Sequence, residues 1–371
     1  MREIIKWFNE STYIAPLSPA CEMCANGSKL VVLITGLCPV KCYYCPLSNE
    51  KSGTDRIFAD EWELEDENDI SKLINESKYI DATGAGITGG DPLVVWKRTK
   101  NYISILKNTF GTDFHIHLYT SAVKNGNHIP DLVSAGLDEI RFHPAPKYWI
   151  DMSKSPIINE IKIALENSID VAIEIPSIPN MNCEIFSLIE WANDIGIKWI
   201  NLNELEYSER NVNNLNHLNY EVKDDISAAV KGSQESAINI IKRVSENNFE
   251  IGIHYCSSSF KDGIQLTNRI KRRAKNIVKA HEVISDEGTL LKGVIYTKNT
   301  SIKNLYKSIK QEFKIKDKHI FLNEEKRCIE IGVWILEKIA TELKKRKLEC
   351  YMVEEYPTAD GLEVERIPLP L

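Results

Sequence analysis

Short apolar runs alternate with amphipathic stretches over the first two thirds of this 371-residue chain. Compact runs of Val, Ile and Leu are typical of buried strands, and apolar residues three and four positions apart are typical of helices. The strand candidates are 30–35, 86–88, 115–120, 139–143, 171–175 and 199–203, and the helix candidates are 68–80, 99–109, 129–135, 156–167 and 183–195. This alternation predicts an α/β fold with a parallel sheet, whose ligand-binding loops follow the carboxyl ends of the strands.

The last third of the chain has a different pattern. A strand candidate at 250–255 and a helical stretch at 265–283 come first. A strand, helix, strand, helix, strand order follows at 289–295, 301–312, 320–322, 328–345 and 350–355. A turn at 286–288 separates the two patterns. We therefore predict an N-terminal extension over 1–29, an α/β domain over 30–283 and a small C-terminal α+β module over 284–371.

Three cysteines, Cys38, Cys42 and Cys45, stand in one loop directly after the first predicted strand. Thiolates bind iron–sulfur clusters, and a four-iron cluster held by only three of them keeps one iron open. An open iron is a place for chemistry, whereas a cluster that only carries electrons is usually closed by a fourth ligand. A zinc knuckle is the alternative, but zinc takes four ligands that usually come in pairs.

Two further loops carry groups that can bind a ligand. Gly89 and Gly90, followed by Asp91 and Pro92, come after the second predicted strand. Paired glycines let the backbone approach a ligand closely, although alone they are more often a plain turn. The dipeptide Thr120-Ser121 ends the third predicted strand, where its hydroxyls could bind a ligand or simply stabilise a turn.

The cysteine loop and the glycine loop together resemble the radical S-adenosylmethionine (SAM) superfamily, over residues 30–203. The closest resemblance is to archaeal-type proteins related to the pyruvate formate-lyase activating enzymes. It implies a partial (β/α)6 barrel and a [4Fe-4S] cluster on the three cysteines, whose open iron binds SAM. It further implies that an electron from an external donor splits SAM into a 5′-deoxyadenosyl radical, which abstracts hydrogen from a substrate.

The resemblance also assigns roles to individual residues. Members of the superfamily carry Gly-Gly-Glu-Pro at the SAM amino group, where this chain has Gly89, Gly90, Asp91 and Pro92. The change from Glu to Asp is mild, because the contact is made by the backbone. Thr120 and Ser121 are implied near the ribose or the methionine end of SAM, and Tyr44 near the adenine. Arg141 and His143 could face the same opening or be structural, and Glu174 is left unassigned.

A second group of thiols predicts a second metal site. Cys21 and Cys24 have the CxxC spacing that binds one tetrahedral metal. His254 and Cys256 lie two apart on a predicted strand and so face the same side of it. We predict a site of Cys21, Cys24 and Cys256, with His254 as a fourth ligand, for iron, zinc or a second cluster. The alternative is a pair of thiols and an unrelated cysteine; Cys183, Cys328 and Cys350 are expected in the core.

The formal net charge of −7 argues against broad nucleic-acid binding. The stretch 261–275 is nevertheless densely basic, with apolar residues on one helical face, and could bind RNA or an acidic peptide or be a solvated surface. The acidic stretch 354–363 is expected to be a solvated turn. RNA, protein and small molecules therefore all stay open as substrates.

We expect an oxidoreductase in the cytoplasm that has no membrane partner. The amino terminus has no apolar signal segment, and the nine cysteines have metal-like spacing rather than the spacing of a disulfide framework. Two other classes are open: an iron–sulfur protein that carries electrons without catalysis, and an RNA-binding module with a degenerate barrel. Binding and cleavage of SAM would distinguish the enzyme from both.

Overall fold

The protein, as a computed structural model, is described for residues 1–225, 227–298 and 301–370. It divides into two compact units, one of Met1–Lys78 with Ala82–Leu266 and one of Tyr79–Asp81 with Thr267–Leu371. The domain boundaries after residues 29 and 283 stay predictions.

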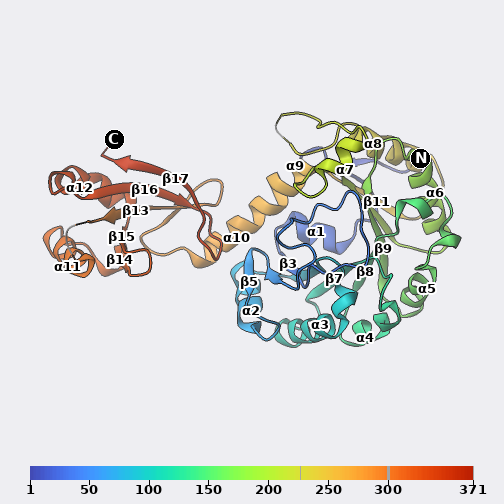
Figure 1. The fold of residues 1–371 in the computed structure, drawn as a ribbon, viewed down its shortest axis with the longest axis horizontal. Coiled ribbons are helices and arrows are strands. Elements are labelled where there is room, and N and C mark those ends of the chain that lie inside the picture. The colour runs from blue at the N-terminus through green and yellow to red at the C-terminus, as the bar shows by residue number, and fades with distance from the viewer. Residues whose placement is uncertain (226, 299–300, 371) are drawn as a thin grey trace. The chain divides into compact units, whose positions relative to one another are not determined.

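Parallel strands form the centre of the first unit (Figure 1). They lie side by side in chain order: β3 (Lys29–Leu33), β6 (Gly84–Thr88), β7 (His115–Thr120), β8 (Glu139–Phe142), β9 (Asp170–Ser177), β10 (Trp199–Glu204) and β11 (Gly252–Cys256). Each pairs in parallel with the next. The predicted α/β class and its parallel sheet are confirmed, and β11 extends the sheet one strand beyond the six predicted units.

Short antiparallel strands close both edges of this sheet. β1 (Ile5–Lys6) and β2 (Thr12–Ile14) continue it beyond β11, and β4 (Ile57–Ala59) and β5 (Trp62–Leu64) continue it beyond β3. The sequence analysis missed these strands, because two or three residues are too few to show a period.

Helices cover the outer face of the curved sheet, and one short helix lies on its inner face (Figure 1). The outer helices include α2 (Ile70–Tyr79), α3 (Trp96–Phe110), α4 (Ile129–Ser134), α5 (Ile158–Glu166), α6 (Asn182–Asp194) and α8 (Ser233–Ser245). Outward-facing strand residues such as Ile116, Ile140 and Ile173 are completely buried beneath them. Helix α1 (Pro19–Ala25) instead packs against β3, β6 and β7 from within.

Three short helical elements complete the described part of the first unit near the ends of the strands. Helix α7 (Val212–His217) follows β10, and α9 (Ser258–Phe260) follows β11. A π-helix, η5 (Lys261–Leu266), continues from α9. π-Helical turns are rare and are found frequently at functional sites.

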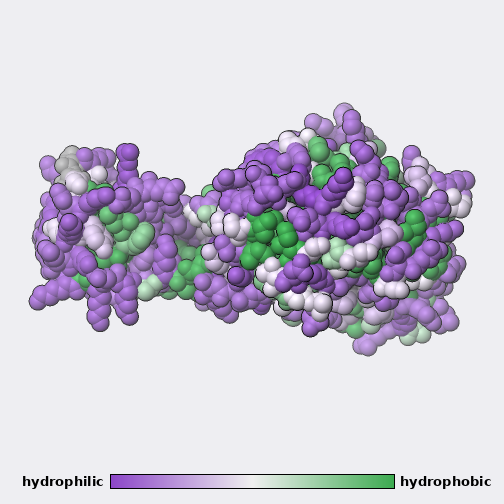
Figure 2. Space-filling model, turned by 90° about the horizontal axis from the view of Figure 1, so that it is seen from below, coloured by the Kyte–Doolittle hydropathy of each residue, from purple (hydrophilic) through white to green (hydrophobic). Residues whose placement is uncertain are grey.

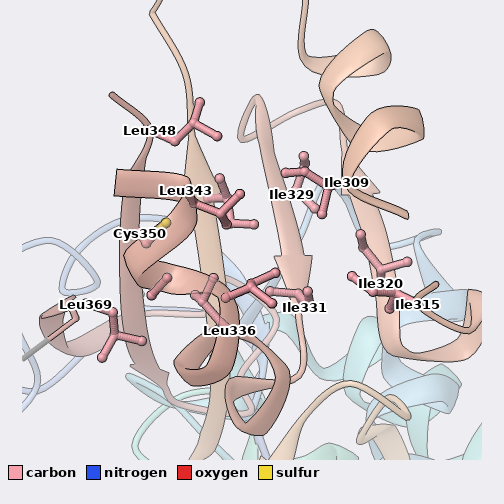
Figure 3. Packing of buried hydrophobic residues seen from close by; sticks show 13 residues of the cluster. Ile309, Ile315, Ile320, Ile329, Ile331, Leu336, Leu343, Leu348, Cys350 and Leu369 are labelled. Carbon is pink, nitrogen blue, oxygen red and sulfur yellow. The ribbon is translucent and has the colours of Figure 1, made fainter. Parts of the chain in front are cut away.

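The second unit is an antiparallel sheet with two helices packed on it. Its elements in chain order are α10 (Thr267–Ile277), β12 (Val283–Ile284), β13 (Leu290–Tyr296), α11 (Ile302–Glu312), β14 (Ile320–Asn323), β15 (Cys328–Ile331), α12 (Val333–Lys345), β16 (Glu349–Glu355) and β17 (Glu363–Leu369). The sheet order β14-β15-β13-β16 is that of a split βαβ motif, extended by β17. Leu336 and Leu343 of α12 face Ile329 and Ile331 of β15 in its core (Figure 3).

Three sequence predictions in this region are wrong in part. Residues 328–345 were predicted as one helix, but Cys328–Ile331 is a completely buried strand that pairs with β13 and β14, and the helix begins after Gly332. The predicted solvated turn at 354–363 contains the end of β16 and the start of β17. The predicted helix over 265–283 is helical only to Ile277 and includes the end of a π-helix.

The face of the protein in Figure 2 has apolar patches among mainly hydrophilic side chains. Among the helices of the described residues, none has both the length and the apolar character that crossing a bilayer requires.

Candidate active site

A cavity of about 700 Å³ lies inside the curved sheet of the first unit. This is within the range typical of ligand pockets. The structure brings most of the predicted site residues to its wall: Cys38, Cys42, Cys45, Tyr44, Gly89, Gly90, Thr120 and Ser121. Arg141 and His143, whose role the sequence left open, and the unassigned Glu174 also line it. Asp91 and Pro92 are buried behind this wall. The loops predicted separately from the sequence therefore meet at one place.

The three cysteines of the loop after β3 face this cavity with different exposure. Cys38 is exposed, and Cys42 and Cys45 are half-buried. Within the described chain, their sulfur atoms do not form a group whose members all lie within 4.8 Å of one another. A single zinc ion needs its ligands to converge, whereas a four-iron cluster binds each thiolate to a different iron. The spacing of the thiols therefore suits a cluster better than a single ion.

The glycine loop after β6 packs directly against the base of the cysteine loop. Gly90 N donates to Thr35 O at 2.7 Å, and Asp91 N donates to Leu37 O at 2.8 Å. A Cβ atom at Gly89, which has a φ of +150°, would lie 2.1 Å from Thr35 O, and one at Gly90 would lie 2.2 Å from Leu37 O. The glycines are therefore required for the contact between the two loops.

The buried carboxylate of Asp91 joins the glycine loop to the end of β7. It accepts hydrogen bonds from Thr120 Oγ1 at 2.7 Å and from Ser121 N at 3.0 Å, and Ser121 Oγ donates to it as well. Burial raises the pKa of Asp91, and these donors oppose the rise. Because both hydroxyl protons are given to Asp91, Thr120 and Ser121 can offer a ligand only their oxygen lone pairs.

Tyr44 is buried at the edge of the cavity, with 5% of its surface exposed. Its Oη lies 2.8 Å from Nε2 of His143, at the end of β8. Two side chains near α7 hold the same loop: Asn211 Nδ2 donates to Tyr44 O at 3.1 Å, and Asn214 Nδ2 donates to Tyr43 O at 3.2 Å. Sequence reasoning missed both asparagines, since nothing local links them to the cysteine loop.

The inner part of the cavity is polar. Arg141 is 3% exposed, and its guanidinium donates to Glu139 and to Glu174 at 2.6 Å each. Lys29 Nζ donates to His115 O at 2.8 Å, and burial lowers the pKa of Lys29 to about 8. The sequence analysis missed Lys29. Polar residues at alternate positions along successive predicted strands are the signal that could have revealed this lining.

The structure gives no support for the predicted second metal site. Both ring nitrogens of His254 are engaged, Nδ1 with Asn201 Oδ1 at 3.0 Å and Nε2 with Ser11 Oγ at 2.9 Å. Cys21 Sγ accepts from Arg141 Nη2 at 3.4 Å, and Cys256 Sγ accepts from Gln265 Nε2 at 3.6 Å. In the part of the chain that is described, no ligand group close enough to hold an ion includes Cys21, Cys24, Cys256 or His254.

Among the described residues, the side chains whose ligand atoms all lie within 4.8 Å of one another are His281, Glu282 and Glu330, in the second unit. Lys292 lies among these carboxylates and donates to Glu330 Oε1 at 3.0 Å. Because this ammonium already supplies a positive charge at the cluster, we interpret the group as a buried ion-pair network.

The other cysteines and the basic stretch have ordinary environments. Cys328 and Cys350 are buried as predicted, but Cys183 is exposed, which contradicts its predicted place in the core. Lys261 Nζ donates to Glu206 Oε1 at 2.9 Å, and Arg273, which is 6% exposed, donates to Pro357 O. Since these two cations are used inside the protein, the stretch 261–275 gives little support to RNA binding.

Comparisons with known proteins place this chain in a family. A sequence-family model described as a domain of unknown function (DUF8061) matches residues 288–369. Over the whole chain, the protein is 39% identical to a protein of Methanocaldococcus jannaschii that is provisionally named a glycyl-radical enzyme activating enzyme. That alignment of 381 residues covers 100% of this chain and 96% of the relative.

Two solved structures are also similar at low identity. Streptococcus suis SuiB bound to S-adenosylmethionine is 11% identical, with a TM-score of 0.42 over 62% of this chain and 50% of that chain. Methylornithine synthase (PylB) is 11% identical, with a TM-score of 0.39 over 58% of this chain and 62% of that chain. This chain thus spans about half the length of SuiB, and likenesses at these scores carry no argument. The 39% identity to the M. jannaschii protein over the whole chain does carry the assignment. The chain belongs to the radical SAM superfamily and is an enzyme of that superfamily.

Proposed function

We propose that the protein holds a [4Fe-4S] cluster on Cys38, Cys42 and Cys45 and reductively cleaves SAM there. The observation that carries this proposal is the cavity, whose wall contains both the three thiols and the paired glycines. They lie where the parallel strands end, which is where ligands bind in α/β proteins. When bound, the cluster supplies an electron from an external donor that breaks a carbon–sulfur bond of SAM, giving a 5′-deoxyadenosyl radical.

The residues of the chain position SAM in this proposal. The N–H groups of Gly90 and Asp91 are already bonded to the cysteine loop, so the carbonyl oxygens of Gly89 and Gly90 are the groups that accept from the SAM ammonium. Ser121 offers lone pairs beside them. Tyr44, in the cavity wall, stays the candidate for contact with the adenine. Asp91, Pro92 and Thr120 hold these loops in place from behind.

We also propose that this oxidoreductase works in the cytoplasm. The nine cysteines form no disulfide with one another, which fits a compartment that keeps thiols reduced. A macromolecular substrate, RNA or protein, stays a prediction from the sequence.

The test is anaerobic reconstitution of the protein with iron and sulfide, followed by reduction with SAM. We expect four irons per chain and formation of 5′-deoxyadenosine, since a cubane cluster has four irons. The Cys42→Ala variant is expected to lose both. Cys183→Ala is the matched control, because Cys183 is an exposed cysteine outside the cavity, and it is expected to retain both.

Two results would contradict the proposal. SAM cleavage by Cys42→Ala at the wild-type rate would remove the three-cysteine cluster from the mechanism. A fully loaded wild-type protein that binds no SAM would favour the electron-carrying alternative.

A further inference from the structure

His117 is a buried side chain without hydrogen-bond partners in the wall of the cavity. It lies on β7 and is 1% exposed. Within the described residues, neither Nδ1 nor Nε2 has a partner. A buried polar group that lacks a partner costs about 1–3 kcal/mol, so native proteins rarely keep one without a reason. Of the buried unpartnered side chains in the described part of the chain, His117 is the one that lines this cavity.

The fold fixes the position of the His117 ring from two sides. Gly86 on β6 is its register partner, and a Cβ atom there would lie 2.7 Å from Cε1 of the ring. The ring of Tyr119 meets the imidazole edge-on, with centroids 4.8 Å apart. Since the glycine provides the space and the tyrosine limits rotation, the imidazole is held in place before any ligand arrives.

The imidazole is neutral. Burial, together with the charges of Lys29 and Arg141, keeps the pKa of His117 well below its usual range. A neutral imidazole has one N–H donor and one acceptor nitrogen. Because the two nitrogens point to opposite sides of the ring, no single group reaches both, and a ligand that satisfies both must offer an acceptor on one side and a donor on the other.

Two buried cations, Lys29 and Arg141, act on the His117 ring. Arg141 is paired with Glu139 and Glu174, at 2.6 Å each. Lys29, whose charge acts on His117, is also within the field of Glu139. Both cations nevertheless lower the pKa of His117, so the potential at the ring is positive. A ligand with a positive charge is therefore disfavoured, because it would be repelled and its burial without a partner would be costly.

His117 lies deep in the cavity. It comes three residues before Thr120, and its partner Gly86 comes three residues before Gly89. At about 3.3 Å per residue, the ring is about 10 Å below the loops that we assign to SAM. Cys24 of the inner helix α1 also lines the cavity. A ligand at His117 must therefore be slim enough to pass the loops, which favours a small molecule over a folded macromolecule.

We propose that the inner part of the cavity, around His117, binds the substrate, and that the substrate is a small polar molecule without positive charge that carries both a hydrogen-bond donor and an acceptor. His117 binds the donor at one ring nitrogen and the acceptor at the other, and thereby selects the substrate. The inference rests on the radical SAM activity proposed above, because it places the substrate beneath SAM.

The first test is a binding measurement without reductant, so that no SAM is cleaved. Full-length protein with SAM is dialysed to equilibrium against the dialysable fraction of an extract from its own cells, and mass spectrometry compares metabolites on the two sides. We expect a polar metabolite without positive charge to be enriched by the wild type and about tenfold less by His117→Phe, which keeps a ring but loses the hydrogen bonds. His117→Gln retains one donor and one acceptor and should restore part of the enrichment. His217→Phe, at an exposed position, should behave as wild type.

Several outcomes overturn the inference: enrichment of cationic metabolites only, enrichment of none, or equal enrichment by wild type and His117→Phe. A second measurement compares deoxyadenosine formation with the dialysable and the macromolecular fractions. Acceleration by the macromolecular fraction alone also overturns it, and points to RNA or protein. A protein that cleaves SAM but enriches no metabolite of the proposed kind keeps the proposed function and loses this inference. One that enriches such a metabolite but never cleaves SAM loses the proposed function instead.

Discussion

The hydroxyl of Tyr44 donates a hydrogen bond to Nε2 of His143, and the direction of this bond follows from its neighbours. Nδ1 of His143 lies 2.7 Å from the backbone carbonyl oxygen of Glu174, which can only accept. Nδ1 therefore carries the proton and Nε2, 2.8 Å from Tyr44 Oη, is the acceptor. Burial lowers the pKa of His143, so the ring stays neutral. The cysteine loop is thus attached to the end of β8.

Tyr44→Phe should loosen this attachment. One lost hydrogen bond is worth about 1 kcal/mol, so the loop should open about fivefold more often. We expect the same iron content after reconstitution but about fivefold faster loss of iron to a chelator, followed by the decay of the cluster absorbance. Tyr43→Phe is the control, because its hydroxyl interacts with Tyr220 instead. Equal loss rates in the two variants would contradict the role given to the Tyr44–His143 bond.

Asp91→Asn should weaken the junction between the glycine loop and β7. An amide nitrogen in place of one carboxylate oxygen would face donors such as Thr120 Oγ1 or Ser121 N instead of accepting from them. With one or two such bonds lost, we expect the free energy of unfolding to fall by about 2 kcal/mol and the Kd for SAM to rise about tenfold. Urea unfolding measures the free energy of unfolding, and equilibrium dialysis with labelled SAM measures the Kd.

The control for Asp91→Asn is Asp131→Asn, an ion-paired aspartate with 40% of its side chain exposed. Exposed pairs contribute little, so its unfolding free energy should change by less than about 1 kcal/mol. If both variants lose the same stability, Asp91 does not have the structural role described here.

Gly89→Ala should separate the glycine loop from the cysteine loop. The new Cβ atom would lie 2.1 Å from the carbonyl oxygen of Thr35, so the backbone must shift and the Gly90–Thr35 bond must lengthen. We expect SAM affinity to fall at least about tenfold. Gly196→Ala is a matched control: Gly196 also has a positive φ, of +82°, but nothing lies within 4 Å of its Cβ position. It should lose about 1 kcal/mol of stability and keep its affinity for SAM. Equal affinities in the two variants would contradict the proposed loop contact.

The sequence predicted the central sheet well because its strands are long enough for their buried runs to stand out. It did not predict α1, although Ser18 and Pro19 form a start signal, because seven residues give too little periodicity. It misread β15, because Cys328–Ile331 leads directly into the apolar pattern of α12.

Residues of the site were predictable where their spacing along the chain is local. The three cysteines and the paired glycines are of this kind. Asn211, which binds Tyr44 from 167 positions away, is not, since only the fold brings the two together. His117 and Gly86 are likewise brought together by the strand register. The unsupported metal prediction at His254 has a different basis: alternation along a strand indicates the face on which the side chain lies, but not that Ser11 and Asn201 contact both ring nitrogens.

The buried histidines should make the fold sensitive to mild acid. Burial lowers the pKa of His254 to about 3, against about 6.5 in the unfolded chain. Between these values the unfolded state binds the extra proton, so the free energy of unfolding must fall as the pH falls. At about pH 5 this one histidine should lower the free energy of unfolding by about 2 kcal/mol relative to neutral pH. Each pH unit between the two pKa values is worth about 1.4 kcal/mol. His115, whose pKa burial lowers to about 4, should act in the same direction.

His254→Gln separates this effect from the titration of carboxylates. The amide can still donate to Ser11 and interact with Asn201, but it cannot take up a proton. Urea unfolding near pH 7 and near pH 5 should show a smaller loss of stability in this variant than in the wild type, by about 2 kcal/mol. His217→Gln, at an exposed position, should show the full wild-type loss. If His254→Gln loses as much stability as the wild type between the two pH values, the neutral state of His254 in the folded protein is not what makes the fold acid-sensitive.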